Sequence, residues 1–263
     1  MATVREIYDR LAEKAPLEMK MDFDNPGFLV GRGGAEVRRV LVSLDITDDV
    51  IEEAKEKGAQ LIVSHHPIFF SLKSVTDGDR LGRKAVALIE SGISAICMHT
   101  NLDAAKGGVN VALADALGLR DTEILNVEGI SSAGEEYSYG RVGLLTEPTP
   151  MTAFLEKVKA ALGANGLRYH DAGRPVYRVA SVGGSGGGML DFAAAKGCDT
   201  FVTADVKYDV FLAAKEMGIN LIDADHFCTE NTVVPALADM IAGRFPEVEV
   251  LISECHRQTA QFM

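Results

Sequence analysis

The sequence has no long apolar run, no paired cysteines and no excess of basic residues. A membrane-spanning helix needs about 20 consecutive apolar residues, whereas the longest apolar runs here have the length of a strand. The first residues carry charges in a helix-like pattern without the apolar stretch of a secretory signal. The four cysteines lie far apart without a C-x-x-C pair, which excludes a zinc ribbon or a disulfide framework. We therefore expect a soluble protein of the reducing cytoplasm that contacts no membrane.

Basic residues are the minority, 26 against 38 acidic residues, so the formal net charge is -12. A nucleic-acid phosphate backbone would be repelled by this charge, and we expect no nucleic-acid partner. Hydrophobic residues make up 47% of the chain and charged residues 24%, which is ordinary globular composition and excludes disorder. The length of 263 residues falls between one large α/β domain and two ordinary ones.

An internal repeat is the strongest structural signal. Residues 39–64 match residues 178–203 without a gap, 139 positions apart, and both copies contain an apolar run, a helical stretch, a Lys-Gly pair and a second apolar run. Both copies continue into another helix and another apolar run, at residues 92–96 and 218–222. Short apolar strands alternating with helices that end at glycine are typical of βαβ units. The sequence predicts an α/β fold built from two duplicated βαβ-type repeats.

A smaller α/β insertion is expected between the repeats. It would contain a strand at residues 140–145, a helix around residues 152–162 and a strand near residues 167–169, with Pro148 and Pro150 at the turn into the helix. The expected domains are the first repeat at residues 1–125, the inserted small domain at residues 126–176 and the second repeat at residues 177–263.

Metal-ligating side chains follow the predicted strands. Parallel α/β sheets bind ligands at the carboxyl ends of their strands. In the first repeat these ends carry His65 and His66 after one strand, and His99 and Asp103 after the next. In the second repeat the corresponding strand is followed by an Asp-Ala-Asp-His-Phe-Cys-Thr-Glu stretch at residues 223–230. We expect these side chains to meet at one sheet edge, where the two repeats form one metal-binding unit.

The candidate ligands are imidazoles and carboxylates without a thiolate, a set that suits Zn, Fe, Mn or Co. Five ligands exceed the three that a mononuclear catalytic zinc takes, so we predict two divalent metal ions per chain, bridged by a carboxylate and a water. His226 and Glu230, four residues apart, would share one helix face, and Glu230 is the candidate bridge. The predicted metal ligands are His65, His66, Asp103, His226 and Glu230.

Several neighbouring residues keep more than one interpretation. His99 is a candidate catalytic acid or base, but a sixth ligand or a residue that orients a ligand fits as well. Asp223 and Asp225 flank His226 and could orient its imidazole. Cys228 fits a metal ligand or a small buried thiol.

The glycine run at residues 183–188 follows a predicted strand and opens a helix, where backbone N–H groups could cradle an anion. It lacks the Lys-Ser/Thr of a P-loop and the spacing of a dinucleotide fingerprint. A tight turn that permits close helix packing is the alternative.

Seven motifs carry a resemblance to a known family: DNPGFLVG at residues 24–31, SHHP at 64–67, HTNLD at 99–103, GGVN at 107–110, the glycine run at 183–188, DVKY at 205–208, and Asp-His through Thr-Glu at 225–230. Over nearly the whole chain, the sequence resembles the GTP cyclohydrolase 1 type 2 homologue family, also called the Nif-three-like family of dinuclear metal proteins. The resemblance implies a two-metal site on the same five ligands. It also implies a ring-shaped homohexamer whose metal sites face an internal cavity.

Two positions depart from the family pattern. Asp209 stands where the family often has His, so a substrate or proton-transfer role is not carried over to it. Asp225 stands where the family often has Gly, and its negative charge would favour cations and oppose an anionic substrate.

These observations favour a metal-dependent hydrolase that acts on a small phosphorylated or heterocyclic, nucleotide-like molecule. The alternative is a non-catalytic metal-binding, scaffold or regulatory protein, which would lack an open coordination position beside a proton donor. A transcription-associated interaction protein follows only from the family's historical naming, and the acidic balance opposes direct DNA contact. The ligand set leaves the metal identity open.

Overall fold

The computed structural model describes residues 1–263, which divide into two compact units. Unit 1 comprises residues 1–106 and 234–257, and unit 2 comprises residues 107–233 and 258–263. Both units combine strands and helices, which confirms the predicted α/β class. None of the helices combines the length and the apolar character needed to span a bilayer.

Unit 1 is built on a five-stranded sheet with the order β15-β4-β5-β6-β2. Its strands are β2 (Gly27–Val30), β4 (Arg39–Ser43), β5 (Leu61–Ser64), β6 (Ser94–Cys97) and β15 (Glu249–Ile252). The first four in the sheet order are parallel, and β2 runs antiparallel to β6. A small ladder pairs β1 (Ala2–Thr3) with β3 (Glu36–Val37). The parallel strands therefore end together at one edge of the sheet.

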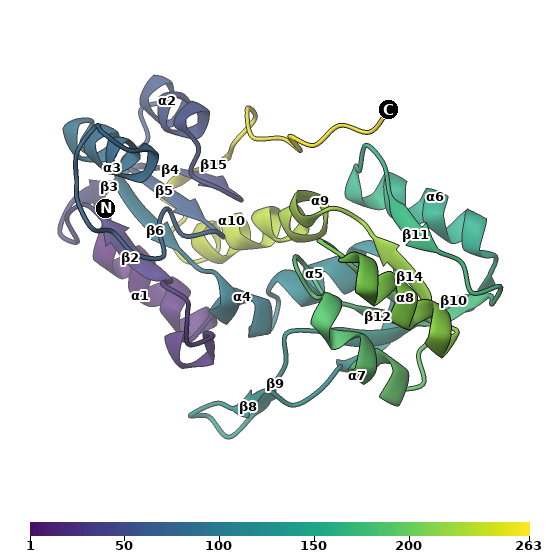
Figure 1. The fold of residues 1–263 in the computed structure, drawn as a ribbon. Coiled ribbons are helices and arrows are strands. Elements are labelled where there is room, and N and C mark those ends of the chain that lie inside the picture. Colours follow the sequence, from purple (N-terminus) through teal and green to yellow (C-terminus); the bar gives the residue numbers. More distant parts are fainter. The chain divides into compact units, whose positions relative to one another are not determined.

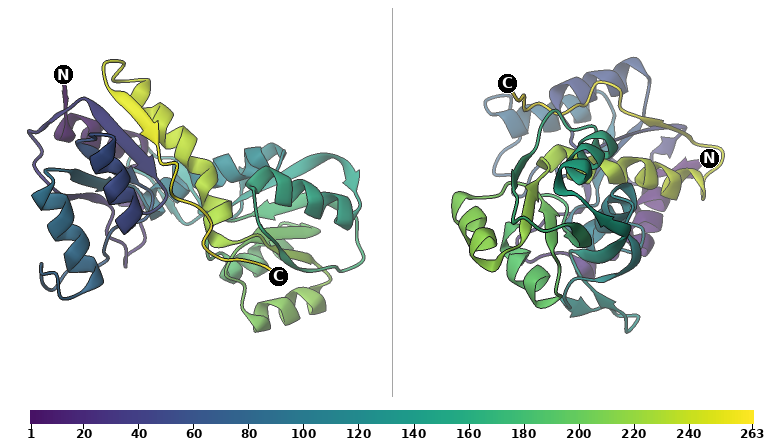
Figure 2. Two further views of the ribbon diagram at one scale, coloured as in Figure 1. Left: turned by 90° about the horizontal axis from the view of Figure 1, so that it is seen from above. Right: turned by 90° about the vertical axis from the view of Figure 1, so that its right-hand side faces the viewer.

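Three of the five helices of unit 1 begin at side chains that cap them. They are α1 (Val4–Lys14), α2 (Asp48–Glu56), α3 (Arg80–Glu90), α4 (Thr100–Ala104) and α10 (Val234–Ala242), with a 3-10 turn at Leu17–Met19. Thr3, Thr47 and Asp79 each accept a backbone N–H at the start of α1, α2 and α3, respectively. Helices α2 and α3 bury apolar residues against β4, β5 and β6, whereas α10 contacts β15 and lies beside it in Figures 1 and 2.

Unit 2 contains a six-stranded sheet with the order β11-β14-β13-β12-β10-β7. Its strands are β7 (Arg120–Ile124), β10 (Arg141–Thr149), β11 (Arg168–His170), β12 (Val176–Ser181), β13 (Thr200–Thr203) and β14 (Asn220–Asp223). Strands β12, β13 and β14 are parallel, and the other pairings are antiparallel. A hairpin of β8 (Gly129–Ile130) and β9 (Glu136–Tyr137) projects from this unit in Figure 1.

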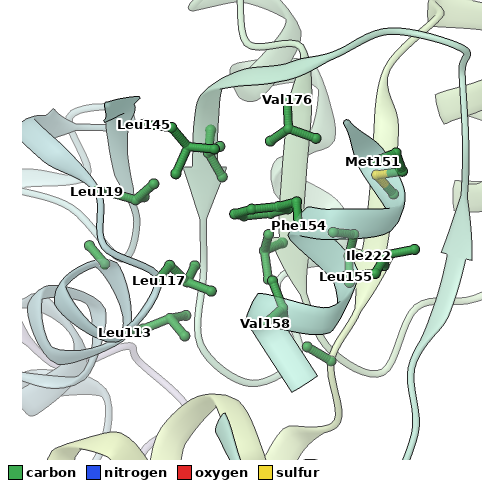
Figure 3. Packing of buried hydrophobic residues seen from close by; sticks show 14 residues of the cluster. Leu113, Leu117, Leu119, Leu145, Met151, Phe154, Leu155, Val158, Val176 and Ile222 are labelled. Atoms are coloured by element: carbon green, nitrogen blue, oxygen red, sulfur yellow. The ribbon is translucent and has the colours of Figure 1, made fainter. Parts of the chain in front are cut away.

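Helices cover both faces of the unit 2 sheet. They are α5 (Val109–Ala116), α6 (Met151–Leu162), α7 (Leu190–Ala195), α8 (Tyr208–Met217) and α9 (His226–Glu230), with 3-10 turns at Gly187–Met189 and Asn231–Val233. On one face, Phe154 of α6 is fully buried among residues of α5 and the sheet, including Leu113 and Val176 (Figure 3). On the other face, α7 and α8 pack against Phe201 and Leu221. Alternate residues of the same strands thus serve two cores.

The two repeated segments adopt the same strand pairing. Val40 of β4 lies opposite Leu61 of β5, and 139 positions later Val179 of β12 lies opposite Thr200 of β13. The parallel order β4-β5-β6 in unit 1 recurs as β12-β13-β14 in unit 2. The common origin of the two segments by duplication stays a prediction.

The compact units divide the chain differently from the ranges expected from the sequence. Residues 126–176 make no unit of their own, because β10 pairs with β12 and α6 packs in the core of unit 2. Residues 234–257, expected in the second repeat, belong to unit 1, because β15 pairs with β4. Strands so far apart in the chain pair without any pattern in the local sequence that would predict the pairing.

Glu53 on α2 anchors the segment that follows β15, and it makes the stability of unit 1 depend on pH. The buried carboxylate accepts hydrogen bonds from the Ser253 hydroxyl at 2.5 Å and from the Glu254 N–H at 2.9 Å. Burial raises its pKa, but these hydrogen bonds and Lys57 outweigh the burial and lower the pKa from 4.5 to about 2. Because the folded-state pKa is lowered, the stabilisation is complete above about pH 4.5 and is lost as the pH falls toward 2.

We expect Glu53→Gln to lower the free energy of unfolding by about 1.5–3 kcal/mol at pH 7, because hydrogen bonds to a charged acceptor are lost. Urea unfolding of wild type and variant at several pH values should show this difference shrinking below pH 4.5. Glu52→Gln on the same helix is the control, since Glu52 is exposed and pairs only with Lys55. Equal stability of Glu53→Gln and wild type at pH 7 would contradict the prediction.

Candidate metal-binding site

Four of the predicted side chains lie together in unit 1, beyond the ends of β5 and β6. Ser64 and Cys97, the last residues of these strands, are register partners. His65 and His66 follow the first strand, His99 follows the second, and Asp103 lies on α4. His65 is fully buried, and the other three side chains are largely buried. These four side chains therefore form a cluster at the strand ends, where the sequence predicts one.

The three imidazoles pack against one another. The ring centroids of His65 and His66 are 4.9 Å apart, and His99 lies 5.2 Å from the first and 5.4 Å from the second. One ring nitrogen from each lies within 4.8 Å of the others, so the group could hold a metal ion. Asp103 brings Oδ1 to 3.6 Å from His65 Nε2. Nitrogen and carboxylate oxygen donors of this kind suit Zn, Fe, Mn or Co.

Each of these rings is oriented by a hydrogen bond between its Nδ1 and an oxygen of the protein. His65 Nδ1 lies 2.9 Å from the carbonyl oxygen of Met98. A carbonyl only accepts, so this nitrogen carries the proton and the lone pair is on Nε2. His66 Nδ1 and His99 Nδ1 lie 2.8 Å and 2.7 Å from carboxylate oxygens of Asp45 and Asp24. Ligating histidines have this arrangement, in which the other ring N–H donates to an oxygen.

Asp24 is the buried partner of His99. Its second oxygen accepts from the N–H of Thr100 at 3.0 Å and from the hydroxyl of Thr100 at 2.5 Å. Burial raises the pKa of Asp24, but the hydrogen bonds from His99 and Thr100 lower it from 3.8 to about 2. The carboxylate is therefore ionised at neutral pH and holds the His99 ring in place. In the sequence, Asp24 stood out only as part of a family motif.

Asp45 is the partner of His66, and it also contacts His256. Its two oxygens lie 2.8 Å from His66 Nδ1 and 2.8 Å from His256 Nε2. Burial raises the pKa of Asp45, but hydrogen bonds from His256 and His66 outweigh the burial and hold the pKa well below its usual range. Sequence reasoning missed both residues. Each follows the carboxyl end of a strand, β4 or β15, so the strand-end rule applied to every strand could have found them.

In unit 2, the short helix α9 carries His226 and Glu230. His226 Nε2 and Glu230 Oε2 are 3.0 Å apart, which confirms that the two side chains share a helix face. Glu230 is only 4% exposed. His226 Nδ1 lies 2.7 Å from Asp205 Oδ2, so this ring too has Nδ1 directed at a carboxylate. Asp205 adopts a φ of +51°, a conformation uncommon for residues other than glycine.

The two aspartates proposed to orient His226 have other partners. Asp223 accepts from Arg168 and from the Val206 N–H. Asp225 accepts from the Cys228 N–H and caps α9. Its φ of +70° favours glycine, which fits the family's frequent glycine at this position. The orienting carboxylate is thus that of Asp205.

The structure does not support a metal-binding role for Cys228 or Asp209. Cys228 is 2% exposed, and burial raises the pKa of its thiol to about 12, so the thiol is neutral. This favours the interpretation as a small buried side chain. Asp209 is exposed in the first turn of α8.

The glycine run uses its N–H groups within the protein. The N–H groups of Gly183, Gly184 and Gly186 donate to side-chain oxygens of Asn110, Thr229 and Thr203 at 2.9, 3.0 and 3.0 Å. These bonds favour the tight turn over the anion cradle. Gly184 also makes room for the candidate ligand. A Cβ there would lie 2.1 Å from Glu230 Oε1.

The family model and the relatives that match this chain point to the same family. The family model for Duf34/NIF3 (NGG1p interacting factor 3) matches residues 2–259. The GTP cyclohydrolase 1 type 2 homolog of Clostridium perfringens is 34% identical over 263 residues, 99% of each chain. The Helicobacter pylori protein named GTP cyclohydrolase 1 type 2 is 32% identical over 244 residues, 92% of each chain.

Among solved structures, a Bacillus cereus protein related to NIF3 has a TM-score of 0.93 at 24% identity, covering 100% of this chain and 99% of its own. The whole-chain match to the family model and the relatives above 30% identity confirm the resemblance drawn from the sequence motifs. The chain belongs to the Duf34/NIF3 (NGG1p interacting factor 3) family.

Proposed function

We propose that this protein is a dinuclear, metal-dependent hydrolase that acts on a small phosphorylated or heterocyclic, nucleotide-like molecule. The observation that carries the proposal is the orientation of four of its six histidines. His65, His66, His99 and His226 each direct Nδ1 at an oxygen of the protein, the arrangement that ligating histidines have. The name of the Helicobacter pylori relative supports the heterocyclic substrate class.

The proposed metal ligands are His65, His66, Asp103, His226 and Glu230, and Glu230 would be the bridging carboxylate. The contacts within each unit support this set, because each unit places an imidazole Nε2 near a carboxylate. When bound, two divalent ions supply Lewis acidity and an activated water. Zn, Fe, Mn and Co all fit the nitrogen and oxygen donors.

His99 is the proposed proton-transfer residue. Asp24 is ionised and accepts a hydrogen bond from the Nδ1–H group, so Nε2 is the atom that would take up or give a proton. The same hydrogen bond fixes the direction of the ring.

We expect His99→Ala to keep its metal and lose about 10²- to 10⁴-fold in rate, the range for one general acid or base. The assay would follow GTP and p-nitrophenyl phosphoesters, with metal content measured on the same sample. Full activity would end the catalytic assignment of His99. Loss of metal would instead make it a ligand.

Elemental analysis tests the proposed function directly. The protein would be purified without chelators and reloaded with Mn, Fe or Zn. We expect about two ions per chain in wild type and fewer in His226→Ala. His170→Ala is the control, because His170 lies in β11 and outside the cluster. Wild type without metal after reloading would overturn the proposal, and two ions without hydrolysis would favour a metal-binding scaffold or regulatory protein.

We also propose a homohexamer, as the family resemblance implies, and a cytoplasmic location, which the pattern of separated cysteines supports. Light scattering of the purified chain tests the assembly. A monomer or dimer at micromolar concentration would contradict it.

A further inference from the structure

We propose that His256 is a positioning residue for the metal ligand His66 and that it acts through Asp45. The proposal rests on the proposed function only in taking His66 as a ligand. The segment at residues 253–256, which follows β15, would therefore help to position a metal ligand of unit 1.

A chain of two hydrogen bonds connects the residues. His66 Nδ1 lies 2.8 Å from Asp45 Oδ1, and His256 Nε2 lies 2.8 Å from Asp45 Oδ2. The Asp45 side chain is 39% exposed, whereas that of His256 is 11% exposed. An exposed carboxylate held at one oxygen can rotate toward water. With both oxygens engaged, it presents Oδ1 to His66 in one orientation.

The backbone near His66 is positioned without His256. The His66 N–H donates to the Leu44 carbonyl at 2.9 Å, and the Ser43 hydroxyl donates to the Asp45 carbonyl at 2.7 Å. The first bond holds the residues after β4 and β5 together, and the second fixes the turn that follows β4. The orientation of the Asp45 carboxylate is what remains for His256 to set. Through that carboxylate, His256 sets the tautomer and ring direction of His66.

The segment that carries His256 is anchored on unit 1. The Ser253 N–H donates to the Val42 carbonyl at 2.8 Å, and its hydroxyl donates to Glu53 at 2.5 Å. The same hydroxyl accepts from the His256 N–H at 3.3 Å. His256 lies 211 positions beyond Asp45 in the chain. Full metal affinity at His66 therefore requires residues 253–256 to be bound to the rest of unit 1.

The test is metal affinity, measured by Mn²⁺ titration on the full chain. We expect His256→Ala to weaken the binding at least about tenfold, the lower end of the range for partners of ligands. His256→Gln should restore most of the affinity, because its amide N–H can donate to Asp45. Arg257→Ala is the control, since the Arg257 guanidinium contacts only the Glu254 carbonyl at 3.4 Å. The visible spectrum of the Co²⁺ form should change in His256→Ala and not in Arg257→Ala.

Ser253→Ala provides a second test that leaves His256 intact, and it should weaken Mn²⁺ binding by loosening the segment. Circular dichroism confirms that each variant is folded. Wild-type affinity in folded His256→Ala would overturn this proposal, and wild-type affinity in Ser253→Ala would do so if His256→Ala does not fold. Failure of wild type itself to bind Mn²⁺, Zn²⁺ or Co²⁺ would instead overturn the proposed function.

Discussion

Gly184→Ala should remove the metal that depends on Glu230 and reduce hydrolysis at least about 100-fold, because a misplaced group at a reacting centre costs that much. The new Cβ would lie 2.1 Å from Glu230 Oε1 and 3.2 Å from His226 Nε2. The turn cannot easily move away, since the Gly184 N–H donates to Thr229 and its carbonyl accepts from Ala204. Its φ of +63° also disfavours a side chain.

Gly188→Ala is the matched control within the same glycine run, because nothing lies within 4 Å of a Cβ there. Both variants would be compared by elemental analysis and by urea unfolding. We expect Gly184→Ala to lose about 1–3 kcal/mol of stability, as a strained backbone position does, and Gly188→Ala to keep its metal. Two ions per chain in Gly184→Ala would show that the carboxylate of Glu230 does not need this space.

Glu230→Ala should bind about one metal ion per chain in place of about two, lose hydrolytic activity and stay folded. The Glu230 side chain is 4% exposed and lies beside His226 Nε2, and α9 contains no other acidic residue that could replace it. Glu230→Gln is the informative companion, since it keeps the size and removes the charge. Unchanged metal content in both variants would remove Glu230 from the bridging role.

Much of the site could be predicted because its signals are local. Short apolar runs mark β5, β6 and β14, and the edge rule for parallel sheets then groups whatever follows them. His65, His66, His99 and Asp103 were found in this way and do lie together in unit 1. The spacing of four residues was enough to pair His226 with Glu230.

The strand-end rule, applied to every strand, would include Asp45 and His256 among its candidates, but it does not show which residues orient the ligands. Asp45 and His256 meet only because β15 pairs with β4, a contact between chain segments more than 200 residues apart. Asp205, rather than Asp223 or Asp225, contacts His226, and its φ of +51° is not visible in the sequence. Which carboxylate reaches a ring depends on loop geometry, and residue type alone does not determine it.

For a similar reason, the sequence alone does not decide between the two interpretations of the glycine run. An anion cradle and a tight turn require the same glycines. They differ in whether the N–H groups find acceptors in the protein, and Asn110, Thr203 and Thr229 come from three separate elements. These three contacts form only when unit 2 has folded, so the sequence alone does not show them.

The pairing of β15 with β4 has a consequence for the order in which the chain folds during synthesis. Until residues 249–252 have been made, β4 is an edge strand with an apolar sequence and open backbone groups. At about 5–20 residues per second, the ribosome needs on the order of ten seconds or more to supply its partner. Residues 107–233, which form unit 2 together with residues 258–263, are made earlier and can fold in the meantime. The nascent protein therefore passes through a state in which most of unit 2 has been made while unit 1 is open to strand-mediated aggregation, and a chaperone that shields β4 would raise its yield.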